Sequence, residues 1–348
     1  MVAKLTDVAE LAGVSPTTVS RVINKKGYLS QKTIDKVHAA MQELNYKPNN
    51  LARGLKGKSA KLVGLIFPNI SNIFYAELIE RLEDELFKQG YKTIICNSEH
   101  DPNKEKDYLE MLSANQCDGI ISSSHNLGIE DYEKVEAPII AFDRNLAPKI
   151  PIISSDNFEG GKLAAKTLVK AGCQRIVMIT GNDNSDSPTG LRQLGFNYEL
   201  NKQGIVCPVP NDLSIMRREL EIKSIICREK PDGIFVSDDL TAILVIKVAR
   251  QLELSIPNDL KIIGYDGTAF IRHFYPELTT IQQPLDEIAK LCVEILLKKI
   301  KGEIVSRDYV LPINLISPSF PIITQRGMES AFNVLIWNPS CKVNIKKK

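Results

Sequence analysis

Residues 14–24 have the sequence Val-Ser-Pro-Thr-Thr-Val-Ser-Arg-Val-Ile-Asn, and this stretch decides the fold of the first part of the 348-residue chain. Ser15 suits a helix N-cap because its hydroxyl can accept a hydrogen bond from a free N–H of the first turn. Pro16 then occupies the first helical position, where its missing N–H costs nothing. The stretch therefore predicts a short helix that begins at Pro16.

Another short helix is expected just before it, over residues 6–12, with Val8, Leu11 and Ala12 on one face. Gly13 stands where that helix must end and the chain must reverse. Two short helices joined by a glycine-containing turn form a helix-turn-helix, although half of an ordinary helical bundle is the competing interpretation. The second helix carries small or hydrogen-bonding side chains suited to the major groove of DNA, namely Thr17, Thr18, Ser20, Arg21 and Asn24.

A third helix is expected after Ser30, whose hydroxyl can cap it, and Pro48 ends this helical region. Its apolar side chains recur at helical spacing, as Ile34, Val37, Met41 and Leu44. They would close a small core over Val8, Leu11, Val19 and Val22. We therefore expect a helix-turn-helix domain over residues 1–47. Residues 48–60 form only a marginal helix alone and are expected to be a hinge, with a plain linker as the alternative.

The charge of the chain is unevenly distributed. Residues 1–58 hold ten Lys or Arg and four Asp or Glu, a formal charge of +6, whereas the whole chain carries +2. A basic head on a mildly acidic body fits a head that binds phosphates. The seven cysteines are odd in number and scattered without a CxxC pair, which favours reduced thiols in the cytoplasm over a metal site or disulfides. Neither a signal peptide nor a membrane span is expected.

From residue 61 onward, short apolar runs alternate with amphipathic segments, which predicts an α/β fold with parallel sheets. The alternation begins again after residue 156, so two similar lobes are expected within a core over residues 61–328. We expect lobe 1 over about 61–155 and 285–311, and lobe 2 over about 156–284 and 312–328. Residues 329–348 are expected to be a disordered tail.

Polar and aromatic side chains follow the ends of the expected strands, where parallel α/β sheets bind ligands. Carboxylates accept hydrogen bonds from hydroxyls, arginine donates two aligned N–H groups, and aromatic rings cover the C–H face of a sugar. Taken singly, each such residue is more often a helix cap or a solvated loop residue. Together they predict a sugar site made from Phe74, Tyr75, Ser122, Asp143, Arg192, Asp238 and Asp266.

An enzyme on the same scaffold is a second interpretation. Carboxylates are present, but the chain has no GxxxxGK[ST] loop, GxSxG elbow or HExxH motif, and its four histidines are isolated. An exported sugar-binding protein is a third interpretation, and the basic head argues against it. We expect no catalytic residue, no metal and no cofactor.

Several longer motifs resemble the LacI/GalR family of bacterial transcription regulators. The most specific is Leu5-Thr-Asp-Val-Ala-Glu-Leu-Ala-Gly-Val-Ser-Pro-Thr-Thr-Val-Ser-Arg-Val-Ile-Asn24. Further matches are Asn45-Tyr-Lys-Pro-Asn-Asn-Leu-Ala-Arg53, Ile263-Gly-Tyr-Asp266 and Leu278-Thr-Thr-Ile281. Gly64-Leu-Ile-Phe-Pro-Asn-Ile-Ser-Asn-Ile-Phe-Tyr75 and Ala141-Phe-Asp-Arg-Asn145 resemble the subgroup of sucrose operon repressors from Gram-positive bacteria.

The resemblance implies a homodimer whose paired heads bind a palindromic operator in double-stranded DNA. Pro16, Thr17 and Arg21 stand where the family's recognition helix meets base edges, and Leu55 stands where a leucine wedges into the minor groove. The full candidate set for DNA contact is Thr6, Ser15, Pro16, Thr17, Ser20, Arg21, Asn24, Asn49, Ala52 and Leu55.

The resemblance also implies a core like that of periplasmic binding proteins, in which Asp143, Arg192, Asp238 and Asp266 bind the effector and Phe74 stacks on it. Sucrose, sucrose 6-phosphate and fructose all remain open as the effector that releases the DNA. A catabolite regulator that answers to a phosphorylated carrier protein is the alternative within the family. Asp238 departs from the asparagine that many members have, which favours a ligand rich in hydroxyls.

Overall fold

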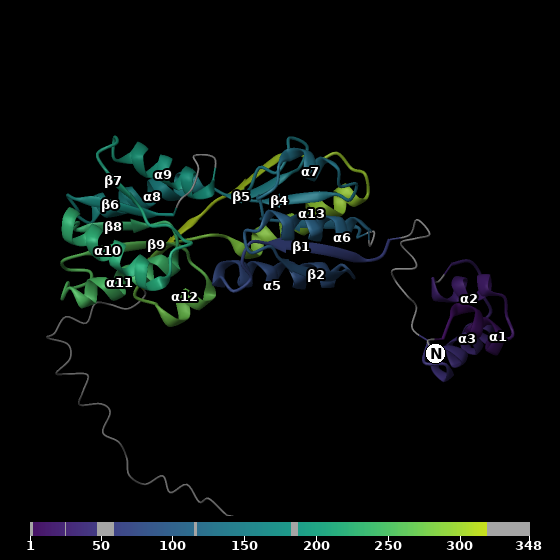
Figure 1. Ribbon diagram of the computed structural model, residues 1–348. Coiled ribbons are helices and arrows are strands. Elements are labelled where there is room, and N and C mark those ends of the chain that lie inside the picture. The colour runs from purple at the N-terminus through teal and green to yellow at the C-terminus, as the bar shows by residue number, and fades with distance from the viewer. Residues whose placement is uncertain (1–2, 25, 47–58, 115–116, 182–186, 319–348) are drawn as a thin grey trace, which may run out of the picture.

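The computed structural model describes residues 3–24, 26–46, 59–114, 117–181 and 187–318. Three helices come first in this part of the chain, and the described residues between 59 and 318 form two α/β lobes (Figure 1). The hinge candidates Asn49, Ala52 and Leu55 and the expected tail, 329–348, lie outside the described residues. None of the helices in the described ranges is long and apolar enough to cross a bilayer.

The N-terminal helices are α1 (Leu5–Ala12), α2 (Pro16–Ile23) and α3 (Gln31–Glu43). The Ser15 hydroxyl accepts a hydrogen bond from the Thr18 N–H at 3.1 Å, which confirms the predicted cap of α2. Gly13 ends α1 with a φ of 64°, a left-handed conformation that glycine adopts without a steric cost. The turn between α1 and α2 is therefore the one that the sequence predicts.

The core of these three helices differs from the prediction at one position. Leu11 was expected inside, but 46% of its surface is exposed, and Ala9 is buried in its place. Val8, Ala9 and Ala12 share the side of α1 that faces the other two helices, and Leu11 lies beyond the edge of that side. The remaining buried residues of this core are Val19, Val22, Val37 and Ala40.

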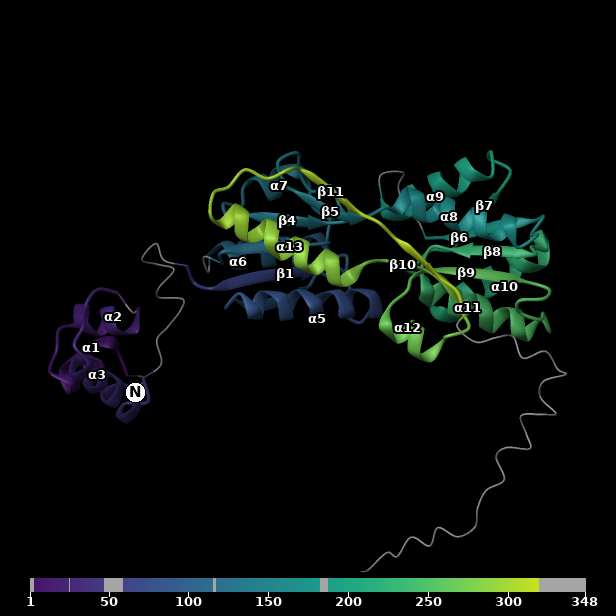
Figure 2. The same ribbon diagram turned by 180° about the vertical axis from the view of Figure 1, so that it is seen from behind.

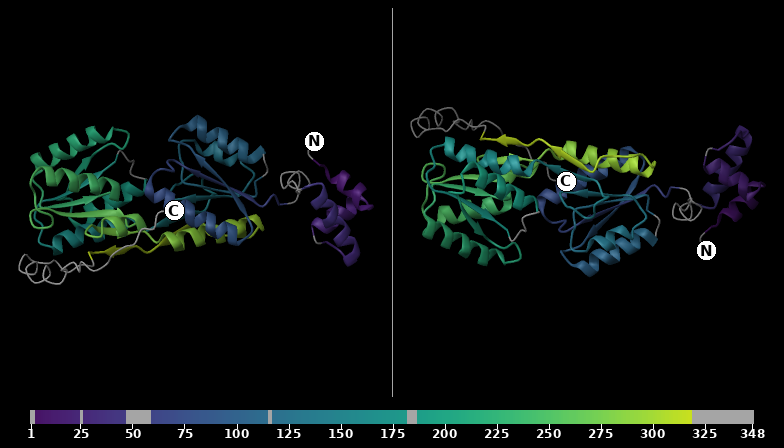
Figure 3. Two further views of the ribbon diagram at one scale, coloured as in Figure 1. Left: turned by 90° about the horizontal axis from the view of Figure 1, so that it is seen from below. Right: turned by 90° about the horizontal axis from the view of Figure 1, so that it is seen from above.

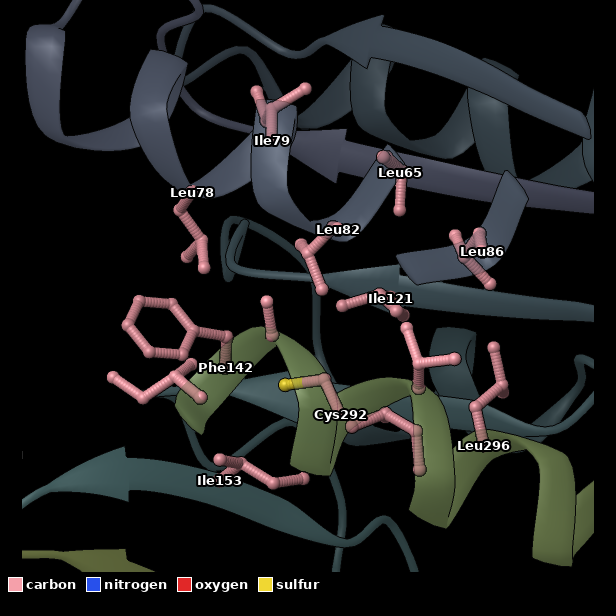
Figure 4. Packing of buried hydrophobic residues seen from close by; sticks show 14 of the residues in the cluster. Leu65, Leu78, Ile79, Leu82, Leu86, Ile121, Phe142, Ile153, Cys292 and Leu296 are labelled. Carbon is pink, nitrogen blue, oxygen red and sulfur yellow. The ribbon is translucent and has the colours of Figure 1, made fainter. Parts of the chain in front are cut away.

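Lobe 1 is a six-stranded sheet with the strand order β11-β5-β4-β3-β1-β2, and its neighbours pair in parallel. Side chains of β1 alternate between two layers, because Leu65 packs toward α5 and α13 and Ile66 toward α6 and α7. Figure 4 shows the first layer, where α5, α13 and the strands share one apolar core. The strands are β1 (Leu62–Phe67), β2 (Lys92–Asn97), β3 (Gly119–Ser122), β4 (Ile139–Phe142), β5 (Ile152–Ser155) and β11 (Asp308–Leu311). The helices are α5 (Ile73–Lys88), α6 (Pro102–Ala114), α7 (Ile129–Glu133) and α13 (Leu285–Ile300).

Lobe 2 repeats this plan with the strand order β12-β10-β9-β8-β6-β7, and only β12, at the edge, runs antiparallel to its neighbour. Helices α8 and α9 cover one face, and α10 and α11 cover the other. The strands are β6 (Ile176–Thr180), β7 (Ile205–Pro208), β8 (Gly233–Val236), β9 (Lys261–Asp266), β10 (Thr279–Gln282) and β12 (Asn314–Ile316). The helices are α8 (Asn157–Lys170), α9 (Pro188–Glu199), α10 (Ile215–Glu229), α11 (Asp239–Gln251) and α12 (Ala269–Phe274).

The chain passes between the lobes three times, from β5 to α8, from β10 to α13 and from β11 to β12 (Figure 2). The segment from α13 to β12 lies along one side of both lobes (Figure 3). Because β5 and β10 both end at a crossing, the carboxyl ends of the parallel strands in each lobe point toward the other lobe. The strand-end residues singled out in the sequence therefore meet between the lobes.

Candidate functional site

Arg192, near the start of α9, is the central residue of the site, although only 6% of its surface is exposed. Its Nε donates to Asn157 Oδ1 at 2.8 Å, and one terminal nitrogen donates to the Ser237 carbonyl oxygen at 2.6 Å. Its guanidinium carbon lies 3.6 Å from the centroid of the Tyr265 ring. Burial disfavours its charge, but negative charges that include Asp266, Asp143 and Asp238 more than offset this and raise its pKa.

Asn157 links Arg192 to the other lobe. Its side-chain nitrogen donates to Asp143 Oδ1 at 3.0 Å, and Asp143 directly follows β4 of lobe 1. Asn157 itself begins α8, just after the first crossing of the chain. The chain of contacts Asp143–Asn157–Arg192 therefore runs from lobe 1 into lobe 2 through a side chain at the crossing.

Gln283 makes a second link at the second crossing. Its Nε2 donates to Asp266 Oδ1 at 2.9 Å, and its Oε1 accepts from the Ser155 hydroxyl at 2.7 Å. Ser155 ends β5 in lobe 1, whereas Asp266 ends β9 in lobe 2. A change in the angle between the lobes must therefore either break these hydrogen bonds or move Asp143 and Asp266 with them.

The two carboxylates have an unusual backbone conformation and environment. Asp143 has a φ of 59° and Asp266 a φ of 119°, in the region that side chains other than glycine avoid. Such strain clusters at functional sites, where the surroundings hold it in place. Burial raises the pKa of both carboxyl groups, and the positive charge of Arg192 opposes the rise at each. The site therefore presents desolvated oxygen acceptors beside a fixed cation, a combination that suits a polyhydroxylated ligand.

Tyr75 and Phe74 contribute the aromatic side chains of lobe 1. Phe74 is 7% exposed and packs against Phe142 with ring centroids 5.9 Å apart, and Tyr75 lies edge-on to Phe74 at 5.4 Å. Burial raises the pKa of the Tyr75 hydroxyl, and the nearby charges that act on it are those of Arg144, Asp143 and Asp266. Tyr75 is thus an aromatic residue of lobe 1 on which the charges of both carboxylates act.

Ser122 is placed differently from the other candidates. It is fully buried, and its hydroxyl accepts from the Ser124 N–H at 3.2 Å, so it stabilises its own turn at the end of β3. Asp238 also has an internal structural role, because it caps α11. Its two carboxylate oxygens accept hydrogen bonds from the N–H and the hydroxyl of Thr241 at 2.8 and 2.6 Å. The structure therefore brings Tyr75, Asp143, Arg192, Asp238 and Asp266 together and leaves Ser122 in a supporting turn.

Two glycines set the position of Arg192. A Cβ on Gly161 of α8 would lie 1.8 Å from the Arg192 carbonyl oxygen, and one on Gly195 of α9 would lie 1.9 Å from the Phe158 carbonyl oxygen. The backbones of α8 and α9 therefore touch, and no side chain fits between them. This close crossing fixes the distance of α9 from the sheet. It therefore also fixes the position of the Arg192 guanidinium.

Three side chains at the site were not in the predicted set. Asn157 and Gln283 hold Asp143, Arg192 and Asp266 in place from the crossings, and their type and position carry no separate signal in the sequence. Arg144 follows Asp143 and acts electrostatically on both Asp143 and Tyr75, while its buried Nε has no hydrogen-bond partner among the described residues. Its place at a strand end is the signal that could have added it to the set.

The candidate DNA-binding surface is the exposed side of α2. Ser15, Pro16, Thr17 and Arg21 are exposed there, and no ion pair within the described ranges involves Arg21. Thr6 on α1 is exposed as well. Ser20 and Asn24 are half-buried, and the Asn24 side chain donates to the Ser20 carbonyl oxygen at 2.6 Å, so this pair stabilises the end of α2.

Comparison with known protein families gives two matches. Residues 4–49 match the model for bacterial regulatory proteins of the lacI family, and residues 165–317 match that for a periplasmic binding protein-like domain. The chain is 69% identical over 317 residues to the sucrose operon repressor of Streptococcus mutans serotype c, an alignment that covers 91% of this chain and 99% of the relative.

Solved structures agree with these matches. The lac repressor dimer bound to operator and the anti-inducer ONPF has a TM-score of 0.79 and 27% identity, covering 91% of this chain and 98% of that one. A periplasmic binding protein/LacI transcriptional regulator from Alkaliphilus metalliredigens, complexed with D-xylulofuranose, has a TM-score of 0.67 and 33% identity, covering 75% and 100%.

Proposed function

Because this chain belongs to the lacI family of bacterial regulatory proteins, we propose that it represses a sucrose-utilisation operon and is released from its operator by a sugar. The observation that carries the sugar part of the proposal is the buried cluster of Arg192, Asp143 and Asp266 between the lobes. The name of the S. mutans relative favours sucrose or a product of sucrose metabolism as the effector.

For the DNA part, α2 enters the major groove with the side that carries Ser15, Pro16, Thr17 and Arg21. Arg21 is the candidate for a guanine contact, because its two aligned N–H groups match the O6 and N7 acceptors of guanine. Its exposure on α2 leaves it available for that contact. Asn49, Ala52 and Leu55 are proposed to act at the centre of the operator, with Leu55 wedged into the minor groove.

For the effector part, a sugar that fills the space between the lobes exchanges hydrogen bonds with both strand-end carboxylates at once. A ligand shifts a conformational equilibrium only by its differential affinity for the two states. Because Asp143 and Asp266 belong to different lobes, the sugar favours the one interlobe angle at which both reach it. Release follows if that angle disfavours the DNA-bound arrangement of the two heads.

Two copies of the chain are proposed to pair through lobe 2. Large apolar side chains are exposed on α10 and α12, namely Ile215, Met216, Leu220, Phe270 and Phe274. Contiguous exposed apolar side chains commonly mark protein interfaces. Met216, which is 75% exposed, gives a direct test, because Met216→Glu should convert a dimer into a monomer in analytical ultracentrifugation, while the exposed Glu221→Gln should not.

The decisive experiment measures binding of the pure protein to a fluorescent palindromic operator at fixed salt, with and without sucrose, sucrose 6-phosphate and fructose. Salt must be fixed because phosphate contacts make the affinity depend steeply on it. Release by one sugar supports the proposal and identifies the effector. Operator binding that no sugar alters would favour a protein partner as the signal. Failure to bind operator, or turnover of a sugar, would contradict the proposal.

A further inference from the structure

A buried carboxylate lies directly behind the sugar site. Asp239 is 1% exposed and follows Asp238 at the start of α11. Its Oδ2 accepts from the Gly267 N–H at 2.8 Å, and its Oδ1 accepts from the Thr280 hydroxyl at 2.7 Å. No ion pair in the described part of the chain involves Asp239. Two neutral donors from different segments therefore hold this carboxylate.

The main chain next to the sugar site packs closely around this carboxylate. A Cβ on Gly264 of β9 would lie 2.1 Å from Asp239 Oδ1, so the carboxylate occupies the space that a side chain would take. A Cβ on Gly267 would lie 2.7 Å from the Gln282 Cα, so the turn after β9 also packs tightly on β10. Asp239 thus ties the start of α11 to both β9 and β10.

The turn that Asp239 holds contains Asp266. Asp266 and Gly267 have consecutive positive φ values of 119° and 61°. Such conformations persist where the surroundings restrain them. Hydrogen bonds supply such restraints here. The Gly267 N–H donates to Asp239, Gln282 Nε2 donates to the Gly267 carbonyl oxygen at 3.4 Å, and Gln283 donates to both the carbonyl and the carboxylate of Asp266. Without Asp239, the Gly267 N–H would be buried without its acceptor.

We propose that Asp239 is a positioning residue of the sugar site: by accepting from the Gly267 N–H it holds Asp266 in the conformation that presents its carboxylate between the lobes. This inference rests on the proposed function, in which Asp266 binds the sugar. Asp239 does not touch the ligand, and it acts through the backbone of the Asp266–Gly267 turn. Sugar affinity is therefore set in part by a side chain on the far side of β9.

Three variants separate this role from a general effect on stability. Asp239→Ala removes both acceptors and should weaken binding of the tightest ligand among sucrose, sucrose 6-phosphate and fructose at least about tenfold in calorimetry. Asp239→Asn should restore affinity to within about threefold, because its oxygen can accept from Gly267 while its NH₂ donates to the Thr280 hydroxyl. Thr280→Val is the matched control, since it removes the other bond of Asp239 and leaves the Gly267 bond, and it should also stay within about threefold.

Amide hydrogen exchange of the full-length protein gives a readout that needs no ligand. Residues 264–270 should exchange faster in Asp239→Ala than in the unaltered protein, Asp239→Asn or Thr280→Val. Unchanged exchange there in Asp239→Ala, or a loss of sugar affinity in Thr280→Val equal to that in Asp239→Ala, would overturn the proposal. If the unaltered protein binds none of the three sugars, the proposed effector class fails, and the exchange comparison still decides the role of Asp239.

Discussion

The guanidinium carbon of Arg192 lies over the Tyr265 ring, 3.6 Å from its centroid, so a buried cation of α9 contacts an aromatic residue of β9. The Tyr265 hydroxyl lies 3.3 Å from the same Asn157 oxygen that accepts from Arg192. Burial raises the pKa of Tyr265 to about 12, so the ring beneath the cation is neutral at physiological pH. The ring and the amide together hold the guanidinium in one orientation.

Arg192→Lys keeps the positive charge and removes the planar fork that makes these contacts. We expect sugar affinity to fall at least about tenfold, because hydrogen bonds to charged groups contribute about 1.5–3 kcal/mol each. Calorimetry with the effector measures this change. Arg175→Lys, at an exposed ion pair with Glu229, is the matched control and should leave the affinity unchanged. Equal affinities for both variants would remove Arg192 from the site.

Asp266→Ala should leave operator affinity intact and abolish release by sugar, because the carboxylate lies between the lobes and far in sequence from α2. Fluorescence anisotropy of labelled operator, titrated with the effector, reports both quantities in one experiment. Asp212→Ala, at an exposed loop position of the same lobe, serves as the control. Sugar release that persists in Asp266→Ala would mean that the ligand binds elsewhere.

Gly161→Ala should destabilise the protein by about 1–3 kcal/mol, since overpacking forces backbone shifts. The added methyl would meet the Arg192 carbonyl oxygen at 1.8 Å, so α9 must move away and take the guanidinium with it. Urea unfolding and sugar calorimetry should therefore both show a loss. Gly128→Ala has no neighbour within 4 Å of the new methyl and should change neither measurement appreciably.

The buried Asp239 predicts a pH-dependent stability. Burial raises its pKa to about 7, with the Asp238 charge adding to the rise and Arg192 opposing it, whereas an unfolded aspartate has a pKa of about 3.9. Between these values the folded state keeps a proton that the unfolded state has lost. The contribution of Asp239 to the free energy of unfolding is therefore fully present below about pH 4 and is lost as the pH rises through about 7.

Asp239→Asn cannot titrate, so its free energy of unfolding should fall less than that of the unaltered protein between pH 5 and pH 7.5. The expected difference is about 2 kcal/mol, because each unit of pKa shift corresponds to about 1.4 kcal/mol. Urea unfolding at the two pH values measures it. Asp143 and Asp266 also have raised pKa values and titrate in both proteins. Because the Asp239 charge contributes to the raised pKa of Asp266, the difference reports the titration of Asp239 together with its effect on Asp266. Identical pH profiles would show that Asp239 is ionised throughout this range.

Arg21→Ala should weaken specific operator binding by about 1–3 kcal/mol and leave binding to random DNA nearly unchanged. The reason is that a guanine contact contributes to specific binding alone, whereas a phosphate contact contributes to both. Lys36→Ala on α3, another exposed cation of the same small domain, provides the comparison. An equal loss on operator and random DNA for Arg21→Ala would identify Arg21 as a phosphate contact.

The alternation of strands and helices was predictable because most core strands are apolar runs with side chains buried on both faces, such as Leu62–Phe67 and Ile176–Thr180. This alternation did not locate every element, and one strand and one helix show why. The strand Ile152–Ser155 is short and ends in two serines, and the amphipathic helix Ile215–Glu229 has only three buried side chains among its charged residues. The four residues of the strand are too few to give a strong periodic signal.

That the candidate sugar-site residues meet was predictable from their position at strand ends, because parallel strands bring those ends to one edge. The groups that hold them were not, because the roles of Asn157, Gln283 and Asp239 depend on contacts between residues far apart in sequence. Leu11 shows the same limit in the small domain: helical spacing places it near the apolar side, and only the approach of the other helices decides which residues are covered.

The threefold crossing of the chain between the lobes has a consequence during synthesis. Helix α13 and strand β11 complete lobe 1, yet they follow all five parallel strands of lobe 2 in the chain. The apolar face of β3, β4 and β5 that α13 covers therefore remains partly uncovered while more than a hundred further residues leave the ribosome. Lobe 1 thus begins first in the chain and is completed last. Its apolar face has to be protected from aggregation until translation has passed Ile300.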